Sequence, residues 1–251
     1  MRRVCLLLCL MLTGLSAAAG EMPPGLEFAQ QPGAVLPLQQ SLMDETGRAV
    51  RLGEYFGRVP VVLVLGYFEC RNLCSTLLDG VVESLARSDL PAAAYRFVAV
   101  SIDPRETAAA ARRRTEAFRP LVADAHFLTG DAEATKRIAA SAGFRYAWDE
   151  ARGEYMHPAG FIVVAPDGRV SRYFSGVRFD PRDVRLALTE ASAGRVGAVS
   201  DRLLLLCSHY DPATGRYTLA AMAAVRAACL LCALGLAGWV WRRGRPRGRR
   251  A

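Results

Sequence analysis

The sequence predicts an α/β domain built on a mixed β-sheet, preceded by a signal sequence and followed by one C-terminal transmembrane helix. Two observations predict this arrangement. Through the middle of the chain, short apolar runs rich in β-branched residues alternate with segments of helical periodicity, which indicates buried strands covered by helices. At each end, an apolar segment lies beside arginines, which is typical of targeting and membrane segments.

Residues 1–19 have the parts of a secretory signal peptide. Arg2 and Arg3 precede an apolar run at residues 4–12, and small residues end the segment. The apolar run is too short to span a bilayer, because a spanning helix needs about 20 apolar residues. We therefore expect residues 1–19 to direct export. An uncleaved signal anchor is the alternative.

Residues 219–241 predict the transmembrane helix, because they are apolar apart from Arg226. At ~1.5 Å rise per residue, a helix of this length covers a hydrocarbon core of ~30 Å. The arginine-rich tail 242–251 follows directly. Because positive charge beside a span marks the cytoplasmic side, we expect a protein of the cell inner membrane with its globular domain in the periplasm. A buried amphipathic helix with a basic tail is the alternative.

The net charge of +8 does not indicate a nucleic-acid partner. Eight of the 32 basic residues are arginines at the two extreme ends of the chain, and the other 24 balance 24 acidic residues. A domain that binds phosphate backbones would gather its positive charge on the folded part. The excess of positive charge is therefore explained by the arginines that flank the predicted signal sequence and membrane span.

The exported body, residues 20–200, begins with a loop-rich stretch and a predicted hairpin at 42–52. A buried strand follows at 60–65, where PVVLVL is a short β-rich apolar run. Residues 76–87 then show helical periodicity. A second buried strand is predicted at 97–102 (FVAVSI).

Asp103, Pro104 and Glu106 predict the start of the next helix, 106–118, because Asp favours the N-cap and Pro and acidic residues favour the first turn.

A weaker strand around Phe127 and a helix at 131–143 follow. Residues 161–174 predict a hairpin around a Pro-Asp-Gly turn. The final helix, 184–194, has the helix-start pattern of Asp180, Pro181 and Asp183 before it, as in the earlier helix.

This order of strands and helices implies a parallel-cored sheet covered on both faces, to which the hairpin adds antiparallel strands. Thioredoxin-like folds have this order, and their active cysteines lie where the first core strand meets its helix. Cys70 and Cys74 fall at that junction.

Cys70 and Cys74 are the only close pair of cysteines in the exported body. The other cysteines lie in the signal sequence (Cys5, Cys9), in the apolar span (Cys229, Cys232) or alone (Cys207). Free N–H groups at a helix N-terminus favour the thiolate, which attacks disulfides and binds metals. With three residues between them, the two sulfurs can form a disulfide or bind one soft ion such as Cu(I). A purely structural disulfide is the alternative.

His157 is the candidate third ligand, since it lies in the loop that enters the strand FIVV. In a thioredoxin-like sheet that strand neighbours the one ending at the cysteines. An imidazole added to two thiolates completes an S₂N site that also accepts Cu(II). We expect His126 to be structural or solvated. Cys207 and His209, in the juxtamembrane segment 201–218, are favoured as a packing cysteine and a surface histidine, with copper relay as the alternative.

The chain resembles the Sco/SenC family of copper-handling proteins, and more closely the bacterial branch with a C-terminal membrane helix. The resemblance covers residues 30–217 and is carried by ordered motifs: GYFECRNLCSTLLDGVVESL, FVAVSIDPRETAAAA and YMHPAGFIVVAPDGRVSRYF. It implies that Cys70, Cys74 and His157 bind copper, as Cu⁺ or Cu²⁺. One departure is Arg71, where the family usually has proline after the first cysteine. This change leaves the ligands intact and the affinity and redox potential open.

The resemblance implies a membrane-anchored copper metallochaperone that assembles the copper centre of a respiratory cytochrome oxidase. Its partner would be the copper-bearing subunit of the oxidase or another copper chaperone. We expect no enzymatic activity, although three alternatives involve thiol chemistry. In a thiol-disulfide reductase that keeps the oxidase cysteines reduced, Cys70 would attack and Cys74 would resolve the mixed disulfide. A regulatory redox sensor is the second alternative. A thiol peroxidase is disfavoured, because Tyr67 stands where such enzymes carry Thr or Ser.

Overall fold

The structure is a computed structural model that describes Leu26, residues 28–69 and 73–195, two short strands near residue 213, and Cys232. Cys70 lies outside the described residues, and only the backbone of Cys74 is described. The predicted signal sequence and tail lie outside them too, as does the predicted span apart from Cys232. Within the described part of the chain, no helix combines the length and hydrophobicity that crossing a bilayer requires.

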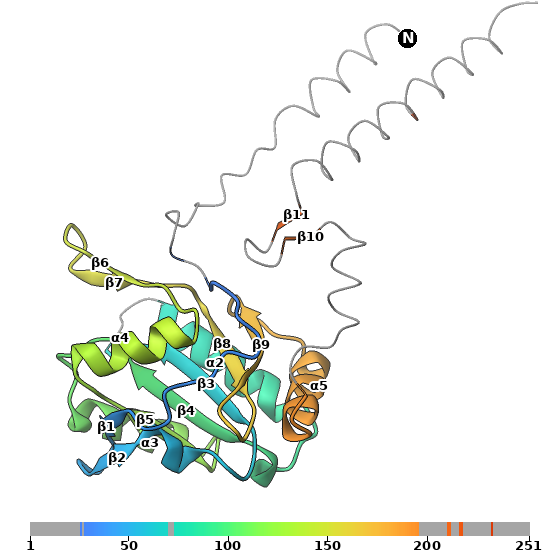
Figure 1. The fold of residues 1–251 in the computed structure, drawn as a ribbon, viewed down its shortest axis with the longest axis horizontal. Helices are drawn as coiled ribbons and strands as arrows, with labels where there is room; N and C mark the ends of the chain where they lie inside the picture. Colours follow the sequence, from blue (N-terminus) through green and yellow to red (C-terminus); the bar gives the residue numbers. More distant parts are fainter. Residues whose placement is uncertain are drawn as a thin grey trace, which may run out of the picture.

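A five-stranded mixed sheet forms the centre of the domain, with the strand order β5-β4-β3-β8-β9 (Figure 1). β3 pairs in parallel with β4, and β4 with β5, whereas β8 runs antiparallel to both β3 and β9. The bounds are Val61–Gly66 for β3, Arg96–Ser101 for β4, Ala125–Leu128 for β5, Gly160–Val164 for β8 and Val170–Ser175 for β9. The predicted parallel core and antiparallel hairpin are therefore confirmed.

Helices cover both faces of the sheet, because alternate residues of each buried strand point to opposite sides. On one face, Val62 and Val64 of β3 belong to the same core cluster as residues of α2, α3 and α5. On the other face, Leu63 and Leu65 share a cluster with residues of α4 and of the N-terminal hairpin. The helices are α2 (Leu73–Ala86), α3 (Ala108–Phe118), α4 (Ala132–Ser141) and α5 (Pro181–Ser192).

Smaller elements complete the described chain. The predicted N-terminal hairpin is confirmed as β1 (Ser41–Met43) and β2 (Ala49–Arg51). An unpredicted hairpin precedes β8, formed by β6 (Ala147–Asp149) and β7 (Glu154–Met156). Two short 3₁₀ helices (Leu52–Tyr55 and Ala92–Ala94) and the paired strands β10 (Tyr210–Asp211) and β11 (Arg216–Tyr217) are the remaining elements.

The prediction that the second helix begins at Asp103 and Glu106 was wrong. α3 begins at Ala108 after Thr107 as its N-cap. The Asp103 carboxylate accepts hydrogen bonds from the backbone and the guanidinium of Arg105, but no helix follows directly. The Glu106 carboxylate accepts from the backbone before Cys70. Glu106 is therefore engaged with a distant part of the chain and not with the first turn of the helix.

The same pattern at Asp180 does begin a helix. The Asp180 carboxylate accepts a hydrogen bond of 2.8 Å from the backbone N–H of Arg182, and α5 starts at Pro181.

Candidate metal centre

Cys74 lies where a loop becomes a helix, and Cys70 precedes it by four positions in the sequence. β3 ends at Gly66, Tyr67 and Phe68 continue toward Cys70, and α2 begins at Leu73. Cys74 is therefore in the first turn of α2, as the sequence predicts. The partial positive charge of a helix N-terminus favours a thiolate there over a neutral thiol.

The topology of the sheet brings His157 to the same edge. β8 pairs antiparallel with β3, in the register Val61 with Val164 and Leu63 with Ile162. The loop before β8 therefore lies at the end of β3, where the cysteine segment starts. A Cβ built on Gly66 would lie 3.8 Å from Cε1 of His157, so the imidazole lies directly over the last residue of β3.

The hydrogen bonding of His157 defines its tautomer. Nδ1 lies 3.0 Å from the carbonyl oxygen of Pro158, and because a carbonyl only accepts, Nδ1 carries the proton. Nε2 is then the nitrogen with a lone pair suited to a metal. Burial lowers the pKa of His157 below its ordinary value, outweighing the Pro158 contact and the Glu154 charge, which raise it. The imidazole is therefore held in the neutral form that ligates metals.

Aromatic rings surround the imidazole. Tyr67 packs edge-on with its centroid at 5.8 Å, and Phe144 lies at 5.7 Å. Tyr155 of β7 contacts Tyr67 at 6.3 Å, and Trp148 of β6 contacts Tyr155 at 5.0 Å. The unpredicted hairpin therefore packs against the side chains beside His157 and limits the positions that its ring can adopt.

A small apolar cavity of about 20 Å³ joins the histidine to both ends of the cysteine segment. Tyr67 and Phe68 before Cys70 line it, as do Leu77 and Leu78 after Cys74, together with His157. No group of three metal-ligating side chains lies among the described residues, which leave out both sulfurs. What the structure shows is that His157 and the residues flanking the two cysteines share one cavity.

Glu106 is a residue at this site that sequence reasoning misassigned. Its carboxylate accepts hydrogen bonds from the backbone N–H groups of Phe68 and Glu69, each at 2.7 Å, and from the hydroxyl of Ser101 at 2.5 Å. Burial raises the pKa of Glu106, against the lowering effect of these hydrogen bonds. The acid was visible in the sequence, but its two backbone partners are 37 and 38 residues away.

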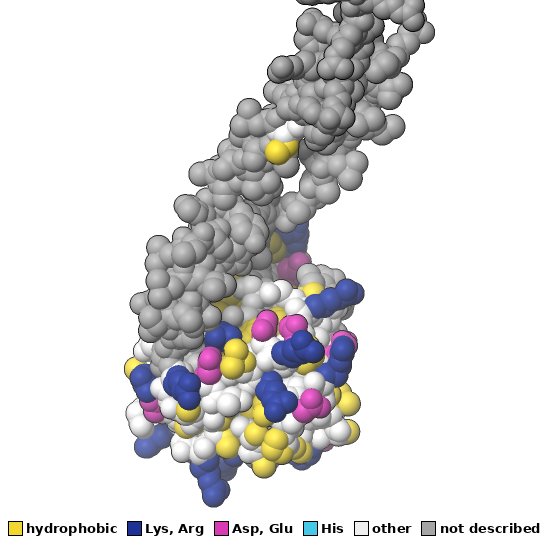
Figure 2. Space-filling model, turned by 90° about the vertical axis from the view of Figure 1, so that its right-hand side faces the viewer, with side chains coloured by type: hydrophobic (Ala, Val, Ile, Leu, Met, Phe, Trp, Pro, Cys, Tyr) yellow, Lys and Arg dark blue, Asp and Glu magenta, His cyan; other side chains and the backbone are white. Residues whose placement is uncertain are grey.

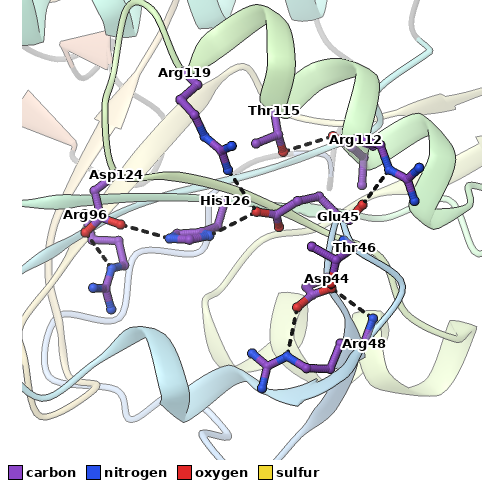
Figure 3. A network of polar contacts seen from close by, with 11 residues as sticks. Asp44, Glu45, Thr46, Arg48, Arg96, Arg112, Thr115, Arg119, Asp124 and His126 are labelled. Carbon is purple, nitrogen blue, oxygen red and sulfur yellow. Dashed lines mark hydrogen bonds and ion pairs between the residues drawn. The ribbon is translucent and has the colours of Figure 1, made fainter.

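His126 lies away from the cavity and has structural partners, as predicted. Its Nε2 lies 2.9 Å from Oδ1 of Asp124, and its Nδ1 lies 3.4 Å from Oε1 of the buried Glu45 (Figure 3). Its ring packs on Tyr55 at 4.8 Å between centroids. His126 therefore links β5 to the turn between β1 and β2.

The charged side chains of the domain are mixed on the face that Figure 2 shows. Lys and Arg are interspersed with Asp and Glu there, rather than gathered into one positive area. Cys207 and His209 lie outside the described residues, so their predicted roles stay predictions.

The fold and the cysteine junction define a thioredoxin-like domain. The chain belongs to the SCO1/SenC family, whose model matches residues 30–191. No curated protein matches the chain in sequence.

Solved structures are similar in fold. Bradyrhizobium japonicum ScoI with copper bound is 23% identical, with a TM-score of 0.51, and the match covers 64% of this chain and 99% of that one. A SCO1/SenC family lipoprotein from Bacillus anthracis is 16% identical, with a TM-score of 0.56 and coverages of 65% and 98%. BsSco, a member of the Sco family of cytochrome c oxidase assembly proteins in which a disulfide switch was identified, is 19% identical, with a TM-score of 0.53 and coverages of 65% and 97%.

Proposed function

We propose that this chain is a membrane-anchored copper metallochaperone that supplies the copper centre of a respiratory cytochrome oxidase. The observation that carries the proposal is the position of His157. Its neutral imidazole lies over Gly66, at a cavity shared with the residues on both sides of the cysteine segment. Membership of the SCO1/SenC family and the copper-bound structure of a relative support it.

Copper would be the cargo, held by the thiolates of Cys70 and Cys74 and by Nε2 of His157. Two thiolates suit Cu(I), and the imidazole extends the site to Cu(II). Such an ion would move by exchange of ligands with thiols and imidazoles of the partner. The contact of Nδ1 with the Pro158 carbonyl keeps the proton off the ligating nitrogen.

The proposal includes a topology. Residues 1–19 would direct export, the domain would face the periplasm, and residues 219–241 would anchor it in the inner membrane. The family domain ends at residue 191, which leaves a juxtamembrane segment before the span.

A thiol-disulfide reductase is the second candidate. The position of Cys74 in the first turn of α2 suits an activated thiol, and a disulfide switch was identified in BsSco. The separation by three residues is unusual for dedicated oxidoreductases of this fold.

Copper titration of the reduced full chain in detergent tests the proposal. We expect about one copper per chain at the site, with sulfur and nitrogen ligation. Cys70→Ser and Cys74→Ser should lose it, and His157→Ala should lose Cu(II) while retaining weak Cu(I) binding. His126→Gln is the matched histidine control, and Cys229→Ser with Cys232→Ser controls for the second cysteine pair. If the site variants bind copper as the unsubstituted chain does, the assignment is wrong.

A further inference from the structure

The backbone directly before Cys70 is held by one carboxylate. Oε1 of Glu106 lies 2.7 Å from the N–H of Phe68 and 2.7 Å from the N–H of Glu69, and Oε2 lies 2.9 Å from the N–H of Phe68. Glu69 is the residue that precedes Cys70 in the chain. Hydrogen bonds to an ionised acceptor are roughly twice as strong as neutral ones, so this contact fixes two successive peptide groups.

The carboxylate of Glu106 is itself held by a hydrogen bond from the sheet. The hydroxyl of Ser101, a fully buried residue at the end of β4, donates to Oε2 of Glu106 at 2.5 Å. β4 is the parallel neighbour of β3, with Gly66 opposite Ser101. Glu106 therefore connects the ends of two adjacent core strands to the loop that carries Cys70.

The side chain of Arg114, on α3, hydrogen bonds to the same loop. The guanidinium of Arg114 donates to the carbonyl oxygen of Phe68, with Nε at 2.7 Å. Phe68 is thus hydrogen bonded through both its N–H and its C=O. Arg113 pairs with Glu69 beside it, but both side chains are about 63% exposed, and pairs of this kind contribute little.

We infer that Glu106, assisted by Arg114, is the positioning residue for Cys70. It acts through the chain, by fixing the two peptide groups that directly precede Cys70. The part of this inference that concerns copper affinity rests on the proposed function. Loss of residues that orient a ligand typically costs about 10- to 100-fold in metal affinity.

The test compares Glu106→Ala and Glu106→Gln in the full chain in detergent, with Glu116→Gln as control. Glu116 is an exposed acid on α3. Three quantities are measured: hydrogen exchange at the amides of Phe68 and Glu69, the alkylation rate of Cys70 read by peptide mass spectrometry, and the affinity and spectrum of bound Cu(II). Alkylation needs no copper, so it decides the inference even if the proposed function fails.

We expect Glu106→Ala to speed exchange at both amides, to change alkylation at least about threefold, and to weaken Cu(II) binding at least about tenfold with an altered spectrum. Glu106→Gln should change amide exchange, alkylation and Cu(II) binding in the same direction but less. The amide oxygen of the glutamine can still accept hydrogen bonds from the backbone, while its NH₂ group faces Ser101. Glu116→Gln should change none.

A folded Glu106→Ala chain with unaltered alkylation and copper spectrum would overturn the inference, even if its thermal stability fell. If Glu106→Ala does not fold, Glu106→Gln decides: unaltered alkylation and spectrum there also overturn it. Failure of Cys70→Ser to affect copper binding would instead overturn the proposed function.

Discussion

The imidazole of His157 lies over the backbone of Gly66, so that a Cβ at position 66 would lie 3.8 Å from its Cε1. Among the residues that the structure describes, no other atom outside the chain neighbours comes within 4 Å of that Cβ position. The last residue of β3 thus lies directly beside the imidazole of His157. A side chain at position 66 would therefore contact the imidazole.

The space over Gly66 gives a graded prediction. Gly66→Ala places a methyl group in ordinary contact with the imidazole, so it should retain Cu(II) affinity. Gly66→Val adds branches that must displace the ring, and we expect a loss of about tenfold, as for other losses of ligand orientation. Isothermal titration and EPR of both variants check this. If Gly66→Val and the unsubstituted chain bind Cu(II) equally well, the imidazole of His157 does not lie over Gly66.

The lowered pKa of His157 predicts a pH dependence of stability. Because the folded-state pKa lies below the ordinary value of 6.5, the unfolded chain binds more protons at this residue between those two values. The free energy of unfolding contributed by His157 therefore increases with pH across that window and falls as pH drops through it.

His157→Gln removes this contribution. Denaturant unfolding of the metal-free chain, with and without the substitution, should show a stability difference that changes across the window and becomes constant more than about one pH unit above 6.5. A difference that is the same at every pH would show that burial does not perturb His157.

The chaperone and the reductase differ in their need for the imidazole. A copper site uses it as a ligand, whereas disulfide exchange depends mainly on the thiols. We expect His157→Ala to impair copper loading of the oxidase in cells sharply, while reduction of a model disulfide by the purified chain changes much less. Cys70→Ser should abolish both. If His157→Ala loads the oxidase normally and Cys70→Ser does not, the reductase should replace the chaperone.

Gly80 of α2 makes a close contact that predicts a loss of stability. A Cβ there would lie 2.0 Å from the carbonyl oxygen of Val177. Alanine gains about 1 kcal/mol in helix propensity, but overlap with a backbone atom forces α2 away from the loop before α5, at about 1–3 kcal/mol or more. Gly80→Ala should therefore lower thermal stability. Asp79→Ala, at the neighbouring exposed position, should not, and equal stability of the two variants would contradict the contact.

The predicted topology is checked with a reporter active only outside the cytoplasm. Fused after Ala251, it should be silent, because the arginine-rich tail follows the predicted span directly. The same reporter fused after residue 200 should be active. Activity after Ala251 would reverse the orientation and remove the oxidising surroundings on which the thiol chemistry depends.

Much of the fold and part of the site were predictable from local patterns. Apolar runs such as 60–65 and 97–102 identified the buried strands, because a strand covered on both faces is apolar at nearly every position. The position of Cys74 in the first turn of a helix followed from the change of periodicity after β3. His157 could be identified as a candidate ligand because it directly precedes a predicted core strand. That its ring lies over Gly66 depends on the register between β3 and β8, which no local pattern encodes.

The two Asp-Pro-x-acid sequences show what only the tertiary structure decided. Asp180 and Asp103 accept nearly the same local hydrogen bond, at 2.8 Å and 2.9 Å, yet α5 begins at once and α3 begins only at Ala108. The difference is Glu106, whose carboxylate binds peptide groups 37 and 38 residues earlier in the chain. A helix cap contributes about 1 kcal/mol, and charge-assisted hydrogen bonds to two backbone amides outweigh it. The sequence by itself therefore determined the core strands, the helices that cover them and the candidate ligands, and the packing of two adjacent strand ends decided which acid holds the loop before Cys70.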